Sequence, residues 1–310
     1  MNLPQAFFKL IRWPNLFFIV LTQILFFYFV LPFVYKNLQS SISLSPGIFF
    51  LIVAASIFIA AAGYIINDYF DLNIDLVNKP SGLIIQKYIN RRWAIVLHLG
   101  LSVTGFLISC YVGYKIRNIY IPFFNFLAIV ALWVYSTTFK KKLLIGNILI
   151  SLLTAWVILV ITVAEYKLSN ADNILFIPRL LKVSFLYGGF AFVISLIREV
   201  IKDMEDIRGD AKYNCKTMPI VWGIQVSKVF AGVWLTVLIG AILILQFYVL
   251  QLGWWLSAVY SIFLIIIPLA WILRKLYHAK LSTEYHTLSS AIKLVMLTGI
   301  LSMIFFRIYL

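Results

Sequence analysis

Long apolar segments recur along the whole chain, with short polar segments between them. Nine of these segments are long enough to cross a bilayer as α-helices, which takes roughly 20 mainly apolar residues. No polar linker divides the chain into separate soluble parts, so the pattern predicts one membrane domain over residues 1–310. The predicted helices cover residues 15–35, 47–66, 93–113, 119–135, 143–164, 180–197, 226–250, 253–272 and 286–308. The expected fold is therefore an all-α integral membrane bundle of nine transmembrane helices.

Composition and charge support this interpretation and orient the bundle. Hydrophobic residues make up 63% of the 310 residues, and charged residues make up 12%. With a cytoplasmic N-terminus, the inside segments hold 17 Lys and Arg and the outside segments hold seven, so we expect the N-terminus inside and the C-terminus outside the cytoplasmic membrane. Because the first helix is about 21 residues long and no small-residue cleavage site follows it, we expect it to be retained.

The net charge of +15 does not by itself indicate a nucleic-acid partner. The basic residues are distributed over many short loops beside the predicted helices. Membrane orientation and the binding of anionic lipid headgroups both require that distribution. We therefore expect membrane lipid as the surroundings, no nucleic acid, and no obligate protein partner.

Acidic residues are concentrated in two short segments. The chain has only 11 Asp and Glu, and eight of them lie within residues 67–80 and 198–210. Both segments contain the spacing D-x-x-D-x-x-x-D, offset by 135 residues, and each follows an even-numbered helix. This weak internal repeat suggests two related halves around one site. The matching acids are Asp68, Asp71 and Asp75 in the first segment, and Asp203, Asp206 and Asp210 in the second.

The spacing predicts a metal site. Intervals of three and four residues place the carboxylates on one face of a helix, and Glu199 joins the second set. Carboxylates on one face repel each other unless a cation compensates them. Mg²⁺ binds one or two carboxylates and completes its shell with phosphate oxygens. Two such faces would hold Mg²⁺, two ions in our expectation, bridging a diphosphate between them.

These motifs resemble the UbiA superfamily of intramembrane prenyltransferases, and the resemblance extends over essentially the whole chain. It includes Arg12-Trp13-Pro14-Asn15, Tyr135-Ser136 and Gly146-Asn147. It implies a central cavity open to the cytoplasm, in which an isoprenyl diphosphate ionises with the help of Mg²⁺ and a lipophilic acceptor captures the allylic cation. An apolar bundle suits this chemistry because it can enclose an isoprenoid tail and exclude water.

The resemblance also assigns roles by motif position. Asn67 and the three acids of the first motif would form one metal cluster, and the acids of the second motif the other. Basic residues beside the clusters are candidates for neutralising the diphosphate. The expected catalytic residues are Asp71, Asp75, Asp206, Asp210 and Lys141; the expected substrate-binding residues are Asn15, Asn67, Lys79, Tyr135, Asn147, Arg198 and Lys202.

The acceptor is suggested by the residues after the first motif. Asn78-Lys79-Pro80 resembles the N-R-P continuation of the digeranylgeranylglyceryl phosphate synthase branch, which transfers a geranylgeranyl group to geranylgeranylglyceryl phosphate and forms an ether lipid. The loop departs from that branch at Leu83-Ile84-Ile85, so prenylation of an aromatic quinone precursor stays open. Lys87, Arg91 and Arg92 in this loop are candidates for binding the acceptor phosphate.

Two alternatives come from other classes of protein. A secondary transporter would also have an internal repeat, but its ionisable groups are expected near the bilayer midplane. Here the acids lie at one edge, and Lys293 is near enough to its helix end to reach the membrane surface. A purely structural lipid-binding protein would not need metal-binding carboxylates.

Overall fold

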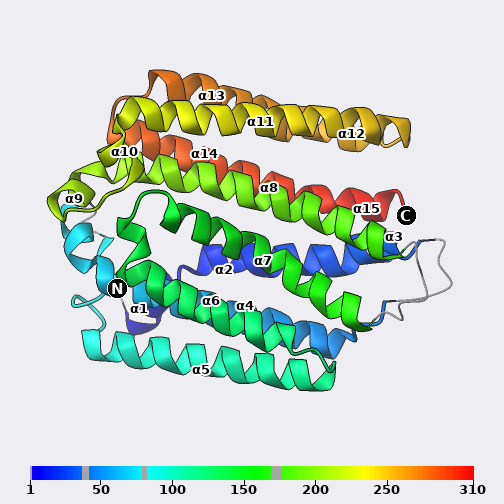
Figure 1. Cartoon of the computed structure of the whole chain (residues 1–310), viewed down its shortest axis with the longest axis horizontal. Helices are drawn as coiled ribbons and strands as arrows, with labels where there is room; N and C mark the ends of the chain where they lie inside the picture. Colours follow the sequence, from blue (N-terminus) through cyan, green and yellow to red (C-terminus); the bar gives the residue numbers. More distant parts are fainter. Residues whose placement is uncertain (1, 37–41, 79–81, 169–175) are drawn as a thin grey trace.

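The chain forms a bundle of long helices that lie side by side (Figure 1). The computed structural model describes residues 2–36, 42–78, 82–168 and 176–310. Within those residues, nine helical segments are long and apolar enough to cross a membrane, which confirms the predicted number.

The first five crossing segments occupy the N-terminal half, after the short helix α1 (Leu3–Leu10). They are α2 (Trp13–Leu25) continued through η1 (Phe26–Val30) and α3 (Leu31–Val34), then α4 (Pro46–Asn78), α5 (Arg91–Lys115), α6 (Tyr120–Thr137) and α7 (Ile145–Leu168), with the turn η3 (Phe139–Lys141) before α7.

The other four crossing segments follow, with two short helices among them. In order, the helices are α8 (Phe176–Glu205), the short α9 (Ile207–Lys212) and α10 (Met218–Val221), α11 (Gly223–Gln251), α12 (Trp255–Ser261) continued by η4 (Ile262–Ile266) and α13 (Ile267–His278), and α14 (Ser282–Leu301) continued by η5 (Ser302–Ile304) and α15 (Phe305–Ile308).

Proline explains the irregular turns in two of the crossing segments. The π-helical turn η1 ends just before Pro32, and the π-helical turn η4 ends just before Pro268. Proline has no backbone N–H and its ring clashes with the carbonyl four residues earlier. A wider turn accommodates that clash while the segment continues across the bundle.

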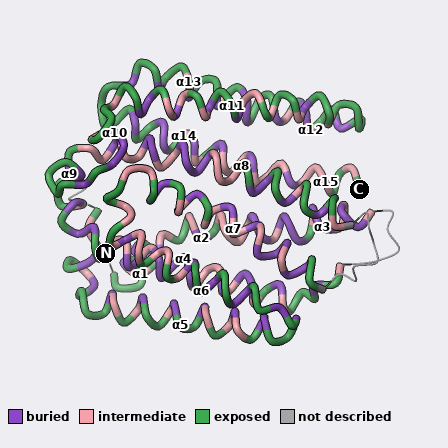
Figure 2. Tube along the Cα trace, viewed as in Figure 1, coloured by how far each residue is buried: buried purple, intermediate pink, exposed green. Residues whose placement is uncertain are grey.

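The helices that carry the predicted site lie in the middle of the bundle. The most apolar windows of α4 and α8 are 50% and 44% buried, whereas those of α11 and α14 are 22% buried. Figure 2 shows exposed residues along the outer side of α5, α11 and α13, and the exposed residues there include large apolar side chains such as Leu107, Phe247 and Trp271. Such a surface is suited to contact with lipid.

Both acid-bearing helices extend past the predicted apolar segments. α4 continues to Asn78 and α8 to Glu205, so the acids lie at the same end of the bundle (Figure 1). The N-terminus lies toward that end and the C-terminus toward the other. The extra turns bring polar groups out of the apolar part of the bundle while keeping them on rigid helices.

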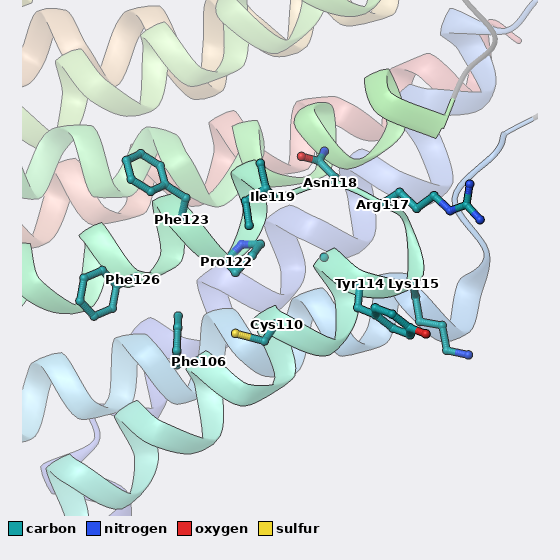
Figure 3. Close-up of a pocket in the computed structure, with 11 residues that line it drawn as sticks. Phe106, Cys110, Tyr114, Lys115, Arg117, Asn118, Ile119, Pro122, Phe123 and Phe126 are labelled. Atoms are coloured by element: carbon teal, nitrogen blue, oxygen red, sulfur yellow. The ribbon is translucent and has the colours of Figure 1, made fainter.

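One pocket lies at the opposite end, and it is not the expected central cavity. It has a volume of about 900 Å³ and lies between α5 and α6, where Phe106 and Phe126 form part of its wall and Lys115 and Arg117 lie toward the end of the helix pair (Figure 3). A cavity that opens beside the acids stays a prediction.

Candidate active site

The first acidic motif lies on a continuous helix, as expected. Asp68, Asp71 and Asp75 lie on α4, where Asp71 is 4% exposed. Asn67 donates from Nδ2 to Asp71 Oδ2 at 2.6 Å, which fixes one oxygen of that carboxylate. Arg12 donates from Nη2 to Asp68 Oδ1 at 2.6 Å. Arg12 stands in the short link between α1 and α2, so the N-terminal segment supplies a counter-charge to this motif.

Lys140, and not Lys141, is the lysine of the basic loop that reaches the acids. The Lys140 ammonium forms an ion pair with Asp71 Oδ2. Its charge also acts on Asp75 and Asp210, one from each motif. Burial by itself would lower the pKa of Lys140, but the Asp71 charge and hydrogen bond outweigh it and raise that pKa above its usual range. Lys140 is therefore a permanent cation between the two motifs.

Local geometry explains why Lys140 points toward the acids while the neighbouring Lys141 is exposed. Residues 139–141 form a 3₁₀ turn, in which successive side chains point about 120° apart. Lys141 is exposed, and its carbonyl accepts a hydrogen bond from the Lys216 backbone N–H at 2.8 Å. Gly146 allows this turn to lie close to α7, because a Cβ there would be 2.8 Å from the Phe139 carbonyl oxygen and 3.1 Å from the Lys140 Cα.

The second acidic motif is divided between two helices, which corrects the expectation of a single helical face. Asp203 lies in the last turn of α8 and accepts a hydrogen bond from the buried Asn147 Nδ2 at 2.8 Å. α8 ends at Glu205, Asp206 lies between the helices with φ −94° and ψ 7°, and Asp210 lies in α9. The bend changes the direction of Asp210 relative to Asp203.

Asn78 explains the bend and joins the two motifs. Its Nδ2 donates to the Asp206 carbonyl oxygen at 3.0 Å, and its Oδ1 accepts from the Gly209 N–H at 2.8 Å. One side chain at the end of α4 thus satisfies a donor and an acceptor where α8 gives way to α9. A Cβ at position 209 would lie 2.5 Å from Asn78 Nδ2, so any residue other than glycine would displace the Asn78 side chain.

Asp210 is buried, with 4% exposure. Burial raises the pKa of Asp210 to about 6, and the nearby Asp206 and Asp71 charges act in the same direction while Lys140 opposes them. Because burial makes the ionised form of Asp210 costly, a nearby cation would stabilise that carboxylate.

A second group of cations lies beside α2, α8 and α14. Arg198 Nη1 forms an ion pair with Glu199 Oε1 at 2.9 Å, and its buried Nε has no hydrogen-bond partner among the described residues. The Lys202 side chain forms no hydrogen bond or ion pair with the residues that the structure describes. Lys293 Nζ donates to Asn15 Oδ1 at 2.6 Å. The predicted residues Asn15, Arg198 and Lys202 therefore face a lysine from the last crossing segment.

The donor set suits Mg²⁺ that is completed by substrate. In the described part of the chain, no three Asp, Glu, His or Cys side chains are close enough to hold an ion by themselves. Mg²⁺ typically takes one or two carboxylates and substrate phosphate oxygens. The buried Asn67 Oδ1 has no hydrogen-bond partner in the part of the chain that the structure describes, so a hard oxygen donor remains available beside Asp71. The residues present fit Mg²⁺, and their assignment as ligands stays a prediction.

Several predicted residues have other outcomes. Lys79 lies outside the described residues. Tyr135 is half-buried in the last turn of α6 and lies close enough to Lys140 and Asp71 to feel their charges. Lys87, Arg91 and Arg92 are exposed, and Arg91 lies over the Tyr69 ring at 4.7 Å.

The sequence analysis did not identify Lys140 or Asn78 as site residues, and it did not predict that Lys293 contacts Asn15. For Lys293 a sequence signal existed, because a basic residue inside an apolar helix marks a functional site more often than chance. For Asn78 there was none, because its partners lie about 130 residues away in the sequence.

The chain is similar to named archaeal proteins and to solved structures. It is 32% identical over 185 residues to the digeranylgeranylglyceryl phosphate synthase of Methanobrevibacter smithii, covering 58% of this chain and 60% of that protein. It is 34% identical over 191 residues to the synthase of Haloquadratum walsbyi, covering 61% of each. The match thus covers less than two thirds of these relatives.

Two solved structures share the fold over almost the whole chain. A UbiA homologue from Aeropyrum pernix K1 aligns with a TM-score of 0.64 at 15% identity, covering 98% of this chain and 99% of that one. A UbiA homologue from Archaeoglobus fulgidus, bound to DMAPP and Mg²⁺, aligns with a TM-score of 0.55 at 15% identity, covering 96% and 99%. The family model of the UbiA prenyltransferases matches residues 24–297, and the chain, an integral membrane protein, belongs to this family.

Proposed function

We propose that this protein transfers a geranylgeranyl group from its diphosphate to the free hydroxyl of geranylgeranylglyceryl phosphate, forming an ether lipid. The observation that carries the proposal is the convergence of two acidic motifs from α4 and from α8 and α9 around the half-buried Lys140. The similarity to synthases with this name supports the choice of acceptor.

The acids would hold the donor diphosphate through Mg²⁺. Asp68, Asp71 and Asp75 would serve one ion, and Asp203, Asp206 and Asp210 a second. When bound, Mg²⁺ supplies positive charge that stabilises the diphosphate as a leaving group. Lys140 lies between the motifs and would donate to a diphosphate oxygen, adding charge where it develops.

The remaining residues would direct the reaction. The bond between the allylic carbon and the diphosphate oxygen breaks, and its electron pair leaves with the diphosphate. The acceptor hydroxyl oxygen then bonds to that carbon, and its proton passes to a carboxylate or water at the edge of the site. Asn147 fixes Asp203, and Asn67 fixes Asp71, so that both carboxylates keep one orientation.

The positive-inside count supports placing this end of the bundle, with the N-terminus, in the cytoplasm and the C-terminus outside. A water-soluble diphosphate would then reach the acids from the cytoplasm while its tail enters the bundle.

The test offers two acceptors in parallel to the purified full chain. Labelled geranylgeranyl diphosphate is supplied with Mg²⁺ and either geranylgeranylglyceryl phosphate or a hydroxybenzoate. We expect ether-lipid product from the first acceptor, no product from the second, and loss of product in excess chelator. Product from the aromatic acceptor alone would refute the acceptor, and full activity in chelator would refute the metal site.

A further inference from the structure

Lys293 has an unusual position for a cation in a membrane protein. It lies on α14 eleven residues after Ser282, which is roughly 16 Å along the helix at 1.5 Å per residue. Its Nζ donates to Asn15 Oδ1 at 2.6 Å and lies 5.4 Å from the centre of the Phe18 ring. Both contacts come from the first two turns of α2, so the ammonium points toward α2 and is held between two crossing helices.

The described residues offer Lys293 no compensating anion. Among the described residues, no carboxylate forms an ion pair with Lys293. The charged groups that act on it through space are Arg198, Arg12 and Lys202, and all three are positive. A half-buried cation among like charges is costly unless an anion joins it.

Arg198 has unused binding capacity on the adjacent helix. α14 packs against α8, which carries Arg198 and lies beside it in Figure 1, and against α2, which carries Asn15. Arg198 uses Nη1 for Glu199, while its buried Nε has no partner among the described residues. Among the described residues, Glu199 is the acid paired within this group, and the charges of Lys202 and Arg198 both compensate it. An incoming anion would therefore meet the full charge of Lys293 and a free guanidinium donor.

This group differs from the diphosphate site in its chemistry. The acids around Lys140 need metal ions before they can hold a phosphate, because their own charge is negative. Lys293 and Arg198 can hold a phosphate directly, without metal. Asn15 adds an amide beside them. The exposed Lys87, Arg91 and Arg92 lack such an enclosed arrangement.

We propose that Lys293 and Arg198, together with Asn15, form the subsite that binds the phosphate monoester of the lipid acceptor. The inference rests on the function proposed above, and it assigns specificity for a phosphorylated alcohol to a residue of the last crossing segment. With its phosphate held beside α14, the acceptor would direct its hydroxyl toward the allylic carbon of the donor, whose diphosphate is held at the acids.

The test varies the lysine and the phosphate together. Lys293→Gln can still donate to Asn15 Oδ1, so the contact between α14 and α2 is kept while the charge is lost. Lys228→Gln is the matched control, because Lys228 is another lysine within a crossing helix, α11, and donates to the Tyr277 carbonyl oxygen at 3.2 Å. Each protein is assayed with geranylgeranylglyceryl phosphate and with the same lipid lacking its phosphate.

Lys293→Gln should raise KM for the phosphorylated acceptor about 10- to 100-fold, as expected for a lost charge-assisted hydrogen bond. KM for the donor diphosphate should stay within about twofold, as should the rate with the acceptor that lacks phosphate, since that lipid has nothing to bind at Lys293. Lys293→Arg should restore most of the affinity, and Lys228→Gln should resemble the wild type.

A second variant does not depend on how Lys293→Gln folds. Asn15→Asp places a carboxylate beside Lys293, which gives the cation a partner and competes with the acceptor phosphate, so it should raise the same KM. The inference is overturned if either variant raises KM for the donor instead, if both acceptors are affected equally, or if neither KM changes. Failure of the proposed function gives a different result, because the wild type would then form no product from geranylgeranylglyceryl phosphate.

Discussion

Lys140→Met should lower kcat strongly and Lys141→Met should not, although the two residues are adjacent and both belong to the basic loop. Lys140 pairs with Asp71, a carboxylate that is 4% exposed, and its charge reaches acids of both motifs. Lys141 is exposed, and its structural contact uses the backbone carbonyl, which the substitution keeps. Methionine is close to lysine in length, so the change removes mainly the charge.

The expected loss for Lys140→Met is about 10²- to 10³-fold in kcat, the usual cost of removing one donor to a developing charge in a water-excluded site. Lys141→Met should stay within about fivefold of the wild type, because an exposed charge contributes at most about 1 kcal/mol. The apparent stability of the Lys140 variant without Mg²⁺ should also fall, since Asp71 then keeps only its hydrogen bond from Asn67.

The assay is the initial rate of ether-lipid formation at saturating substrates, with size-exclusion profiles in detergent to show that each variant is folded. Equal losses in the two variants would refute the distinction drawn from the 3₁₀ turn. A Lys140 variant with normal kcat would refute its placement at the diphosphate.

Three further predictions test the acids and the link between the motifs. Gly209→Ala should displace Asn78 and cost about 1–3 kcal/mol for two lost hydrogen bonds, which lowers the thermal midpoint and the activity. Gly240→Ala, with open space around it, should lower neither, and equal midpoints of the two variants would contradict this. Asp71→Ala and Asp206→Ala should abolish turnover while folded protein is still recovered from membranes, and near-normal rates would show that these acids are not metal ligands. Because burial raises the pKa of Asp210 to about 6, protons should compete with Mg²⁺ below that pH; the half-saturating Mg²⁺ concentration should rise roughly fourfold at pH 5.5 relative to pH 7.5, excess Mg²⁺ should restore the rate, and an unchanged Mg²⁺ midpoint would refute the role of Asp210.

The number of crossing helices could be predicted from the sequence because the requirement behind it is local. A bilayer demands a run of apolar residues of known length, and each of the nine runs meets that demand independently of the others. The helical ends were less predictable. α4 extends 12 residues beyond the predicted end at residue 66. The apolar pattern stops at residue 66 because the acids follow it, but the backbone remains helical.

The second motif shows where local spacing fails. Its acids repeat the spacing of the first, and spacing alone predicts the same straight helix. The end of α8 depends instead on Asn78, which belongs to the other motif. Its side chain donates to the Asp206 carbonyl oxygen and accepts from the Gly209 N–H. Contacts between distant parts of the chain decide such breaks.

The choice among the three lysines of the basic loop had the same origin. Lys140, Lys141 and Lys142 are equivalent in charge and in distance from the preceding helix, so composition could not rank them. The direction of each side chain follows from the 3₁₀ turn and from the close approach of α7 at Gly146, neither of which charge patterning reveals.

The ion pairs at the acids connect metal binding with donor binding. The repulsion expected among carboxylates on one face is relieved in the structure by Arg12 at Asp68 and by Lys140 at Asp71. Lys140 can turn to a diphosphate only when another cation takes its place at Asp71, since a bare carboxylate with 4% exposure would be left behind. A diphosphate that arrives with its own Mg²⁺ satisfies both requirements in one step. We therefore infer that the donor binds as its Mg²⁺ complex. Without metal the diphosphate should bind weakly, because Lys140 then stays in its ion pair with Asp71.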